Sequence, residues 1–232
     1  GGGINDAVDE SWGPKMDGRL IPQFFSNGQP VPFVAYPNNV RDFFNTGYTY
    51  NNGVSIASSD DKSDFRFSYN NMKQTGVIPN SEQGRNSFLI NTSYRITPKL
   101  TLHAIANYIR DDADNLPGAG GKRSTSTMLQ FTWFGRQVDI SRLKNFVDVN
   151  GNSSNWNNAY YSNPYFVAYQ NTVGQRRDRI IGSVDLNYKI VDGLTANLRT
   201  GNDYYTDRRK LRIAYGTSGT PFVSYEEDAY TL

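Results

Sequence analysis

Residues 87–110 read SFLINTSYRITPKLTLHAIANYIR, and this stretch decides the fold. Its apolar residues fall on every second position in both halves, which is the side-chain period of a β-strand. The residues at these positions are Phe88, Ile90, Thr92, Tyr94, Ile96, Leu100, Leu102, Ala104, Ala106 and Tyr108. A three-residue turn at 97–99 keeps both apolar rows on one face, whereas a two-residue turn would place them on opposite faces. The stretch therefore predicts strands at about 86–96 and 100–110, with Ile96 opposite Leu100.

The same pattern returns farther along the chain, where a turn at 191–193 joins strands expected at about 177–190 and 194–206. Two further strands, at about 48–58 and 63–71, precede the first hairpin. A four-residue turn between them explains why the apolar residues change from even to odd positions. The chain is therefore expected to be all-β, with six strands that alternate in direction.

Aromatic rings bracket the aliphatic rows of both hairpins. Tyr94 and Tyr188 each stand two residues before the last apolar residue of their strands, near the short turns. Phe88, Tyr108 and Tyr204 lie toward the other end. Two aromatic levels around an aliphatic band are typical of a membrane interface. We therefore expect the apolar face to lie against lipid, with no second protein layer over it.

The connections between strands divide into short turns at one end of the sheet and long loops at the other. The short turns are 59–62, 97–99 and 191–193, and the long connections are 72–85, 111–176 and the residues from 206 onward. Outer-membrane barrels show this asymmetry, with short periplasmic turns and long extracellular loops. Tilted strands of about ten residues also suffice to cross a bilayer. The sequence thus predicts a segment of an antiparallel transmembrane β-barrel.

The composition excludes several functional classes. Among the 232 residues there is no cysteine and only one histidine, His103, which excludes disulfides, thiolate metal sites and multi-histidine metal sites. A net charge of +2 gives no support to nucleic-acid binding, which requires a clustered basic face. No apolar run approaches the roughly 20 residues of a membrane helix. We expect no metal, no cofactor and no nucleic-acid partner.

The N-terminal 46 residues and the connection 111–176 are expected to form ordered loops. The first segment is rich in Gly, Pro and Asn and has no sustained period, apart from one helical turn at 40–46. The second is long enough to imply a function. Within it we expect a short helix at 141–147 and another with Asn163 as its N-cap.

The sequence NWNNAYYSNPYF, residues 155–166, contains the candidate ligand-binding residues. These are Trp156, Asn158, Tyr160, Tyr161 and Tyr165. Flat rings stack on sugar faces, and Asn amides offer donors and acceptors to hydroxyl groups. The alternative is that the rings fold the loop itself or contact a partner protein that covers it.

Three clusters of carboxylates invite an enzymatic interpretation. They are Asp60 with Asp61, then Asp111 with Asp112 and Asp114, then Glu226 with Glu227 and Asp228. We expect all three to lie in turns or loops as solvated charge, without the paired geometry of a glycosidase. The chain is therefore not expected to be an enzyme.

Six segments, taken in order, resemble the SusC/RagA family of TonB-dependent outer-membrane transporters. They are ESWGPKMDGRLI (10–21), NVRDFFNTGYTYNN (39–52), RFSYNNMKQTGVIPNS (66–81), TWFGRQVDISRLKNF (132–146), NPYFVAYQNT (163–172) and RDRIIGSVDLNYKIVDGLTANLRTGNDYY (177–205). The resemblance implies a plugged barrel of the 22-stranded class in the outer membrane, of which this chain would supply about a quarter. We expect an internal piece of the barrel domain, with the plug outside this chain.

The same resemblance implies the partners. A SusD-like surface lipoprotein would cover the barrel and help to capture oligosaccharides or peptides. The TonB–ExbB–ExbD machinery would drive uptake through an N-terminal region missing from this chain. The alternatives are a soluble carbohydrate-binding β-sandwich, a surface adhesin module and a surface glycosidase. A sandwich would cover the apolar face with a second layer.

Overall fold

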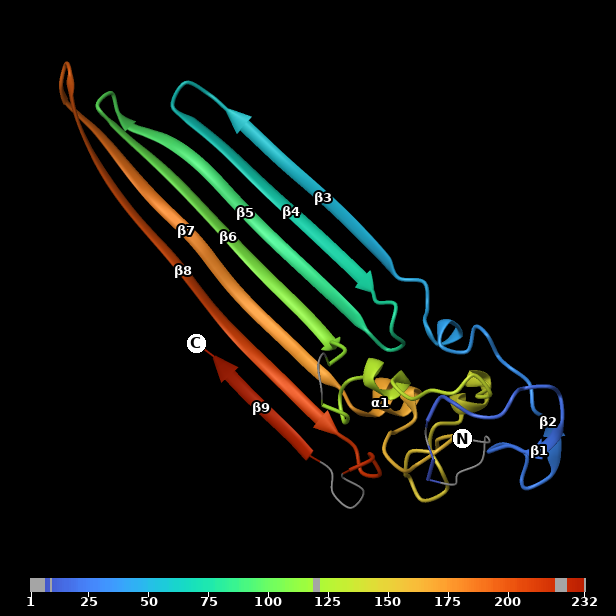
Figure 1. Cartoon of the computed structure of the whole chain (residues 1–232). Helices are drawn as coiled ribbons and strands as arrows, with labels where there is room; N and C mark the ends of the chain where they lie inside the picture. The colour runs from blue at the N-terminus through green and yellow to red at the C-terminus, as the bar shows by residue number, and fades with distance from the viewer. Residues whose placement is uncertain (1–6, 9, 119–121, 220–224, 232) are drawn as a thin grey trace.

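The computed structural model describes residues 7–8, 10–118, 122–219 and 225–231. Seven strands form one antiparallel sheet in sequence order, and two short strands form a separate hairpin (Figure 1). The large sheet contains β3 (Tyr48–Ser59), β4 (Ser63–Thr75), β5 (Glu82–Thr97), β6 (Leu100–Asn115), β7 (Val173–Val191), β8 (Leu194–Ile213) and β9 (Tyr225–Thr231). The small hairpin pairs β1 (Leu20–Pro22) with β2 (Pro30–Pro32). The expected all-β, antiparallel class is confirmed, and across the described residues the large sheet is open.

Both long hairpins have the predicted register through most of their length, and both change it near the turn. Tyr94 pairs with Leu102, as a three-residue turn requires, but the last pair is Thr97 with Leu100. The β7–β8 hairpin has the same one-residue shift beside its turn, where Gly193 adopts a φ of 86°. A bulge takes up the extra residue in each case. The apolar rows therefore stay on one face, although the turns themselves are tighter than expected.

Strands β4 to β8 are longer than the sequence predicts, by four to seven residues at the end away from the short turns. Strands β5 to β8 extend beyond their apolar rows into charged segments. There the cross-strand contacts are ion pairs, such as Arg85 with Asp111 at 2.5 Å and Arg177 with Asp207 at 2.6 Å. A search for alternating apolar residues does not detect such pairs, because both members are charged.

Strand β9 corrects the expectation that the chain from 206 onward is a connection. It pairs with the last part of β8, from Asp207 with Thr231 to Ile213 with Tyr225. Its sequence, YEEDAYT, has no apolar alternation. Cationic residues of β8 compensate its carboxylates, and Lys210 is paired with Glu226. Ion pairs with β8 thus stabilise β9, whose sequence lacks the alternating apolar residues by which the other strands were predicted.

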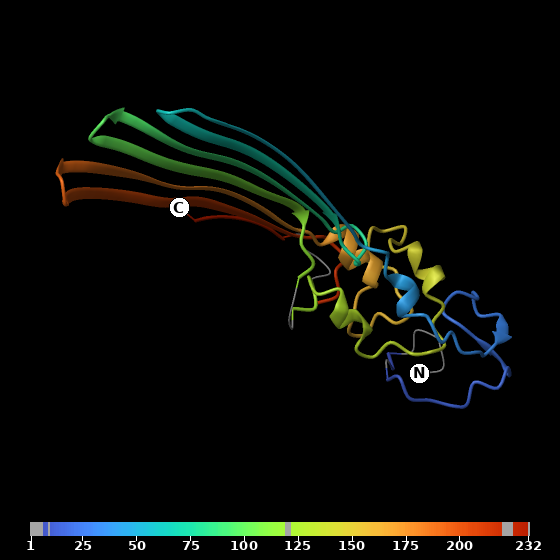
Figure 2. The ribbon, with the colours of Figure 1, turned by 90° about the horizontal axis from the view of Figure 1, so that it is seen from above.

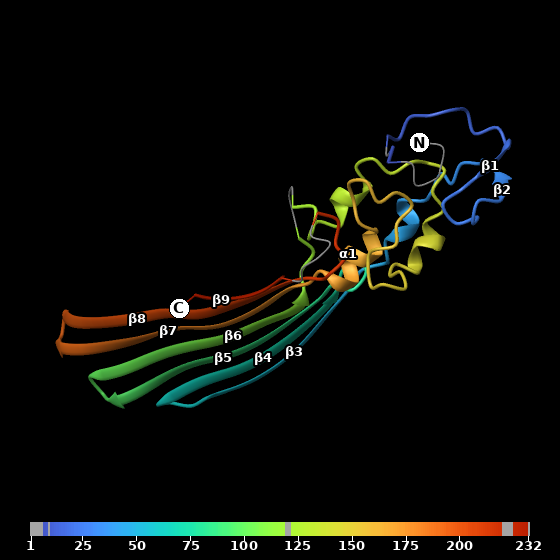
Figure 3. The same cartoon turned by 90° about the horizontal axis from the view of Figure 1, so that it is seen from below.

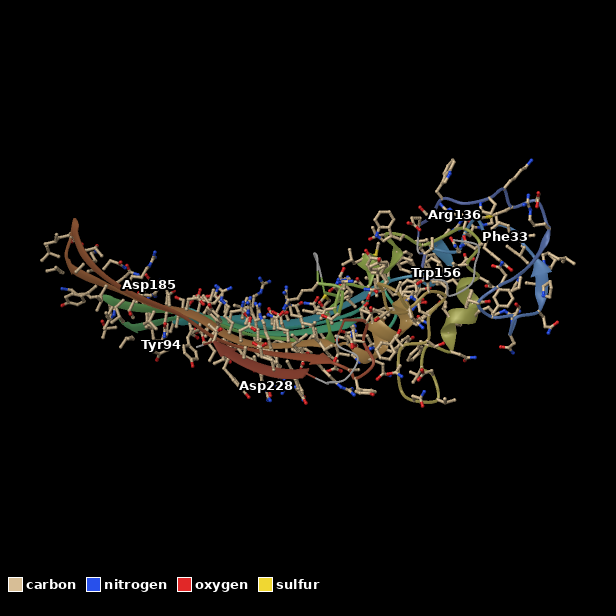
Figure 4. All side chains as sticks on the ribbon, turned by 60° about the horizontal axis from the view of Figure 1, so that its bottom comes forward. Phe33, Tyr94, Arg136, Trp156, Asp185 and Asp228 are labelled. Carbon is tan, nitrogen blue, oxygen red and sulfur yellow. The ribbon has the colours of Figure 1, made fainter. Side chains whose placement is uncertain are left out.

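The two faces of the sheet differ in chemistry. Figure 4 shows Tyr94 and Asp228 on one side of the sheet and Asp185 on the other. The side of Tyr94, here called the apolar face, remains uncovered, with Phe88 39%, Ile90 50% and Leu198 65% exposed. Figures 2 and 3 show the same curved single layer from above and below. The second layer that a sandwich requires is absent from the described residues.

The buried core lies beyond the strand ends, not on the sheet. Residues 7–47, 116–172 and 214–219, as far as they are described, form a compact unit at that end, here called the lobe (Figure 2). Its core consists of Phe43, Phe134, Val138, Ile140, Leu143, Trp156, Tyr165 and Ala168. Its helices are η1 (Arg41–Phe43), η2 (Met128–Phe131), η3 (Ile140–Lys144) and α1 (Pro164–Gln170). The helical turns expected near 40–46, 141–147 and Asn163 are present, whereas η2 was not expected.

Asn115, at the end of β6, joins the lobe to the sheet. Its amide nitrogen donates to the carbonyl oxygens of Asn80 at 2.9 Å and Ala168 at 3.1 Å. Its amide oxygen accepts from the backbone N–H of Val173, the first residue of β7, at 3.0 Å. Because Asn115 is buried, these bonds satisfy backbone groups that no strand partner reaches. Asn115 therefore links the end of β6 to α1 of the lobe, to the 76–81 loop and to the start of β7.

Candidate functional site

Two of the five predicted ligand-binding residues belong to the core of the lobe. Trp156 is 4% exposed and packs edge-on against Phe134, with ring centroids 6.1 Å apart. Tyr165 is 6% exposed, and its ring lies 4.8 Å from that of Phe43. Burial raises the pKa of the Tyr165 hydroxyl above its ordinary value. Trp156 and Tyr165 are therefore packed inside the lobe, where neighbouring rings occupy the space that a ligand would need, and the structure gives no support to their prediction as ligand-binding residues.

Two asparagines of the same stretch, Asn157 and Asn163, are also used internally. The amide of Asn163 donates to the carbonyl oxygens of Leu143 and Ser154, both at 2.7 Å. The amide of Asn157 donates to the carbonyl oxygen of Val8 at 2.9 Å. Both asparagines are buried. These amides replace backbone pairing in an irregular chain, so they do not face solvent as partners for hydroxyl groups.

The other three predicted residues lie at the surface, beside a residue that the sequence analysis missed. Asn158 is exposed and Tyr160 is 52% exposed. The Nε1–H of Trp133 donates to the hydroxyl oxygen of Tyr161 at 2.9 Å, and Trp133 is itself 44% exposed. Arg123 donates to the carbonyl oxygen of Tyr160 at 3.0 Å. We call Trp133, Asn158, Tyr160 and Tyr161 the aromatic site.

The aromatic site combines groups that recognise sugars or peptides. Its rings provide flat apolar surface, and the Tyr160 hydroxyl and the Asn158 amide are groups that can hydrogen-bond to hydroxyl or peptide groups. Trp133 follows η2 and lies outside the Asn-rich stretch, so clustering along the sequence did not include it. The sequence feature that could have pointed to Trp133 is its place in TWFGRQVDISRLKNF, one of the segments that resemble the family.

The face of the sheet opposite the apolar face, here called the polar face, is lined with paired charges. Arg179 contacts Asp203 at 2.5 Å, and Arg199 is paired with Asp185. The amide of Asn197 donates to that of Asn187 at 2.7 Å. These pairs leave the polar face charge-balanced, with its charged and amide side chains committed to one another. In Figure 4 the lobe rises on the side of Asp185, and therefore of this polar face.

A hollow of about 480 Å³ lies where β3–β6 meet the lobe. Its lining includes the apolar side chains of Val77, Ile78, Leu116 and Pro117 and the polar side chain of Gln83. Because it is open and has no cluster of catalytic groups, it provides space for a small group without implying a reaction.

The carboxylate clusters have structural partners, and two of them do not lie in loops as expected. Asp60 does lie in a turn, where it accepts from the backbone N–H groups of Lys62 and Ser63, both at 2.7 Å. Asp111 and Asp112 lie in β6, and Glu226 to Asp228 lie in β9. Because these residues are charged, the search for alternating apolar residues did not place them in strands. It missed β9 for the same reason.

Two further features concern metals and membrane helices. Within the described ranges, no group of three or more His, Asp or Glu side chains is placed to hold a metal ion. Among the same residues, every helix is too short to span a bilayer.

Comparison with known proteins gives a likeness of fold. No protein-family model and no curated protein matches the chain. Among solved structures, the chain is similar to one described as the RagAB peptide importer in its "closed-closed" state, with a TM-score of 0.59 and 15% sequence identity. The match covers 92% of this chain and 24% of that chain. At this level of identity the likeness shows the fold alone, and this chain spans about a quarter of its neighbour's length.

Proposed function

We propose that this chain is a wall segment, with its extracellular lobe, of an outer-membrane importer of the SusC/RagA type. The observation that carries the proposal is the uncovered apolar face, which is bracketed by aromatic rings and backed by a polar face. The fold likeness to a peptide importer supports it. A sandwich would need a second layer over this face, and a soluble adhesin module would leave the face exposed to water.

The dimensions of the apolar face suit a bilayer. On β8 it runs from Leu194 to Tyr204, about 33 Å at about 3.3 Å per residue. Tilting the strand by about 45° reduces this length to a height of about 23 Å, close to the apolar band of outer-membrane barrels. Near the Tyr204 end, the ring of Phe88 lies 4.7 Å from that of Tyr69 and 6.3 Å from that of Tyr108. Such rows of rings are expected at the boundary between hydrocarbon and headgroups.

The open edges support a larger barrel. The outer edge of β3 has no strand partner among the described residues, and β8 has none beside residues 194–206. Unpaired N–H and C=O groups are not tolerated in hydrocarbon, so further strands must complete both edges. The proposal assigns those strands, the plug and the contact with TonB–ExbB–ExbD to regions outside this chain.

The proposed role of the chain is structural and recognitional, with no covalent chemistry. Under it, the polar face lines the interior and the lobe contributes to the mouth of the pore, where a SusD-like lipoprotein would deliver peptides or oligosaccharides. The paired charges of the polar face support a hydrated lining, and the exposed rings of the aromatic site support contact with substrate or partner.

The test is made on the complete protein that contains this chain. We expect it to fractionate with the outer membrane, to migrate as a compact band in SDS unless boiled, and to accumulate labelled peptide or oligosaccharide only with an active TonB system. Recovery in the soluble fraction would overturn the proposal. Rapid hydrolysis of an oligosaccharide by the purified protein would overturn its non-enzymatic part.

Substitution of Trp133 by alanine should weaken ligand binding without unfolding the lobe. Exposed Trp side chains at binding sites often contribute 2 kcal/mol or more, so we expect an affinity loss of about thirtyfold. The measurement is a titration of the purified protein with the imported peptide or oligosaccharide. Trp12→Ala is the matched control, because Trp12 is a 90% exposed tryptophan outside the aromatic site. Equal affinities for the two variants would remove Trp133 from the binding surface.

A further inference from the structure

Asparagine followed directly by glycine occurs three times in the chain, at Asn27–Gly28, Asn52–Gly53 and Asn150–Gly151. Asparagine is one of the chemically labile residues of proteins, because the backbone nitrogen of the next residue can attack its side-chain carbonyl carbon. Glycine favours this attack, since it has no Cβ to hinder rotation or approach. The attack needs a backbone that can rotate and a glycine N–H that is not held in a hydrogen bond. The surroundings of each pair therefore decide whether it reacts.

Asn52–Gly53 is protected by strand pairing. It lies inside β3, where every residue is paired with β4, and it stands opposite Asn70 and Asn71. Ring closure between the side chain and the backbone would require the extended chain to rotate out of this ladder. Because pairing continues on both sides, the rotation would break several cross-strand hydrogen bonds.

Asn150–Gly151 is protected by a turn that Asp148 holds together. The N–H of Gly151, which is the attacking group, donates to the carbonyl oxygen of Asp148 at 3.1 Å. The Asp148 carboxylate accepts from the N–H groups of Asn150 and Asn152, both at 2.8 Å. All three hydrogen bonds oppose the rotation that would bring the Gly151 nitrogen to the Asn150 side chain.

Asn27–Gly28 has none of this protection. It lies in the loop between β1 and β2, at the end of the lobe away from the large sheet (Figure 1). Both residues are exposed, with φ angles of 50° and 79°. One hydrogen bond closes the turn, from the N–H of Gln29 to the carbonyl oxygen of Ser26 at 2.9 Å. In the part of the chain that the structure describes, the N–H of Gly28 has no hydrogen-bond partner, and a Cβ at Gly28 would meet nothing within 4 Å.

The hairpin that carries this pair is weakly closed beside the loop. Strands β1 and β2 pair at three positions, and the pair next to the loop is Pro22 with Pro30. Neither proline has an N–H to donate. The first half of the loop is anchored, because the guanidinium of Arg142 lies 4.9 Å from the centre of the Phe25 ring. The tip can therefore open while the rest of the hairpin stays on the lobe.

We propose that Asn27 is a site of spontaneous covalent modification, at which the asparagine becomes aspartate or isoaspartate. The Gly28 nitrogen gives up its proton and forms a bond to the side-chain carbonyl carbon of Asn27. The bond from that carbon to the amide nitrogen breaks, and this nitrogen takes up the proton and leaves as ammonia. Water then opens the cyclic imide at either of its two carbonyl groups. Overall, a water molecule is consumed and an ammonia molecule is released, with no oxidation or reduction.

The modification changes the charge of the lobe. It adds a carboxylate at the exposed end of the β1–β2 hairpin, and isoaspartate also lengthens the backbone there. Because the Gly28 nitrogen must lose its proton, the rate should rise with pH. The inference does not depend on the proposed function, since it needs only the exposed tip and the chemistry of the pair.

The test incubates the folded complete protein at mildly alkaline pH and follows the peptides that contain the three pairs by mass spectrometry. Conversion of the amide to a carboxyl group raises the peptide mass, and an isoaspartyl methyltransferase labels the isoaspartate product. Three backbone hydrogen bonds hold the Asp148 turn and one closes the Asn27 turn. Each bond that must open first lowers the reactive population by about fivefold, so Asn27 should react at least about tenfold faster than Asn150.

Two controls make the result decisive. In Asn27→Gln the longer side chain would have to close a larger ring, which forms far more slowly, so the same peptide should keep its mass. In protein denatured by boiling in SDS, Asn52 and Asn150 should react at rates close to that of Asn27, because no strand or turn holds them. Equal rates at Asn27 and Asn150 in the folded protein, or a mass increase in the Asn27→Gln peptide, would overturn the inference.

Discussion

A Val184→Arg variant of the complete protein should fail to fold stably in lipid. Val184 lies on the apolar face of β7, near the middle of the band, and is 38% exposed. Its neighbours on that face are Ala104 and Thr200, neither of which can pair with a guanidinium. An arginine on the lipid face at the bilayer midplane costs about 2–4 kcal/mol. We therefore expect a lower urea midpoint in vesicles and a reduced amount of compact protein in the outer membrane.

The adjacent residue provides the matched control. Ser183 is in the same strand at the same depth, but its side chain lies on the polar face, where it pairs with Ile105 and Gly201. Gly201 leaves space for a longer side chain, and under the proposed function a guanidinium on this face would lie in water. Ser183→Arg should therefore unfold at nearly the wild-type urea concentration. A control as damaging as Val184→Arg would show that the two faces do not differ as proposed.

The fold was predictable wherever the side chains alternate in polarity. The apolar rows that include Ile90 and Leu198 predicted the strands, their register and the uncovered face. Only the two-residue period of a strand places the apolar residues of each row on one face. The charged ends of the strands were not predictable in this way. There Arg177 pairs with Asp207 and Lys210 with Glu226, and a run of such residues has the composition of a loop. Only the register of β8 shows that they are partners across strands.

The candidate site was predictable in composition but not in accessibility. Aromatic rings and asparagines serve both ligand binding and the packing of irregular chains. Trp156 is buried in a core cluster that also contains Phe43 and Phe134, and both are distant from it in the sequence. Trp133 was missed for the same reason, since its contact with Tyr161 joins two separate parts of the lobe. Neither the burial of Trp156 nor the contact of Trp133 with Tyr161 can be read from the local sequence.

An Asn163→Ala variant should loosen the lobe while leaving the sheet intact. Asn163 is fully buried and makes three hydrogen bonds through its side chain. Two are donations to the carbonyl oxygens of Leu143 and Ser154, and the third caps α1 by accepting from the N–H of Tyr165 at 2.8 Å. Each buried group left without a partner costs about 1–3 kcal/mol. We expect the lobe to lose about 3 kcal/mol or more of local stability.

Hydrogen exchange on the complete protein measures this loss. Amides of α1 should exchange at least about a hundredfold faster in Asn163→Ala, because 1.4 kcal/mol corresponds to a factor of ten. Asn163→Ser should lie between alanine and wild type, since its hydroxyl can still cap the helix but cannot make both donations. Asn150→Ala is the control, because this exposed residue uses only its backbone N–H to contact Asp148. Unchanged exchange in α1 of Asn163→Ala would show that the buried amide does not hold the lobe together.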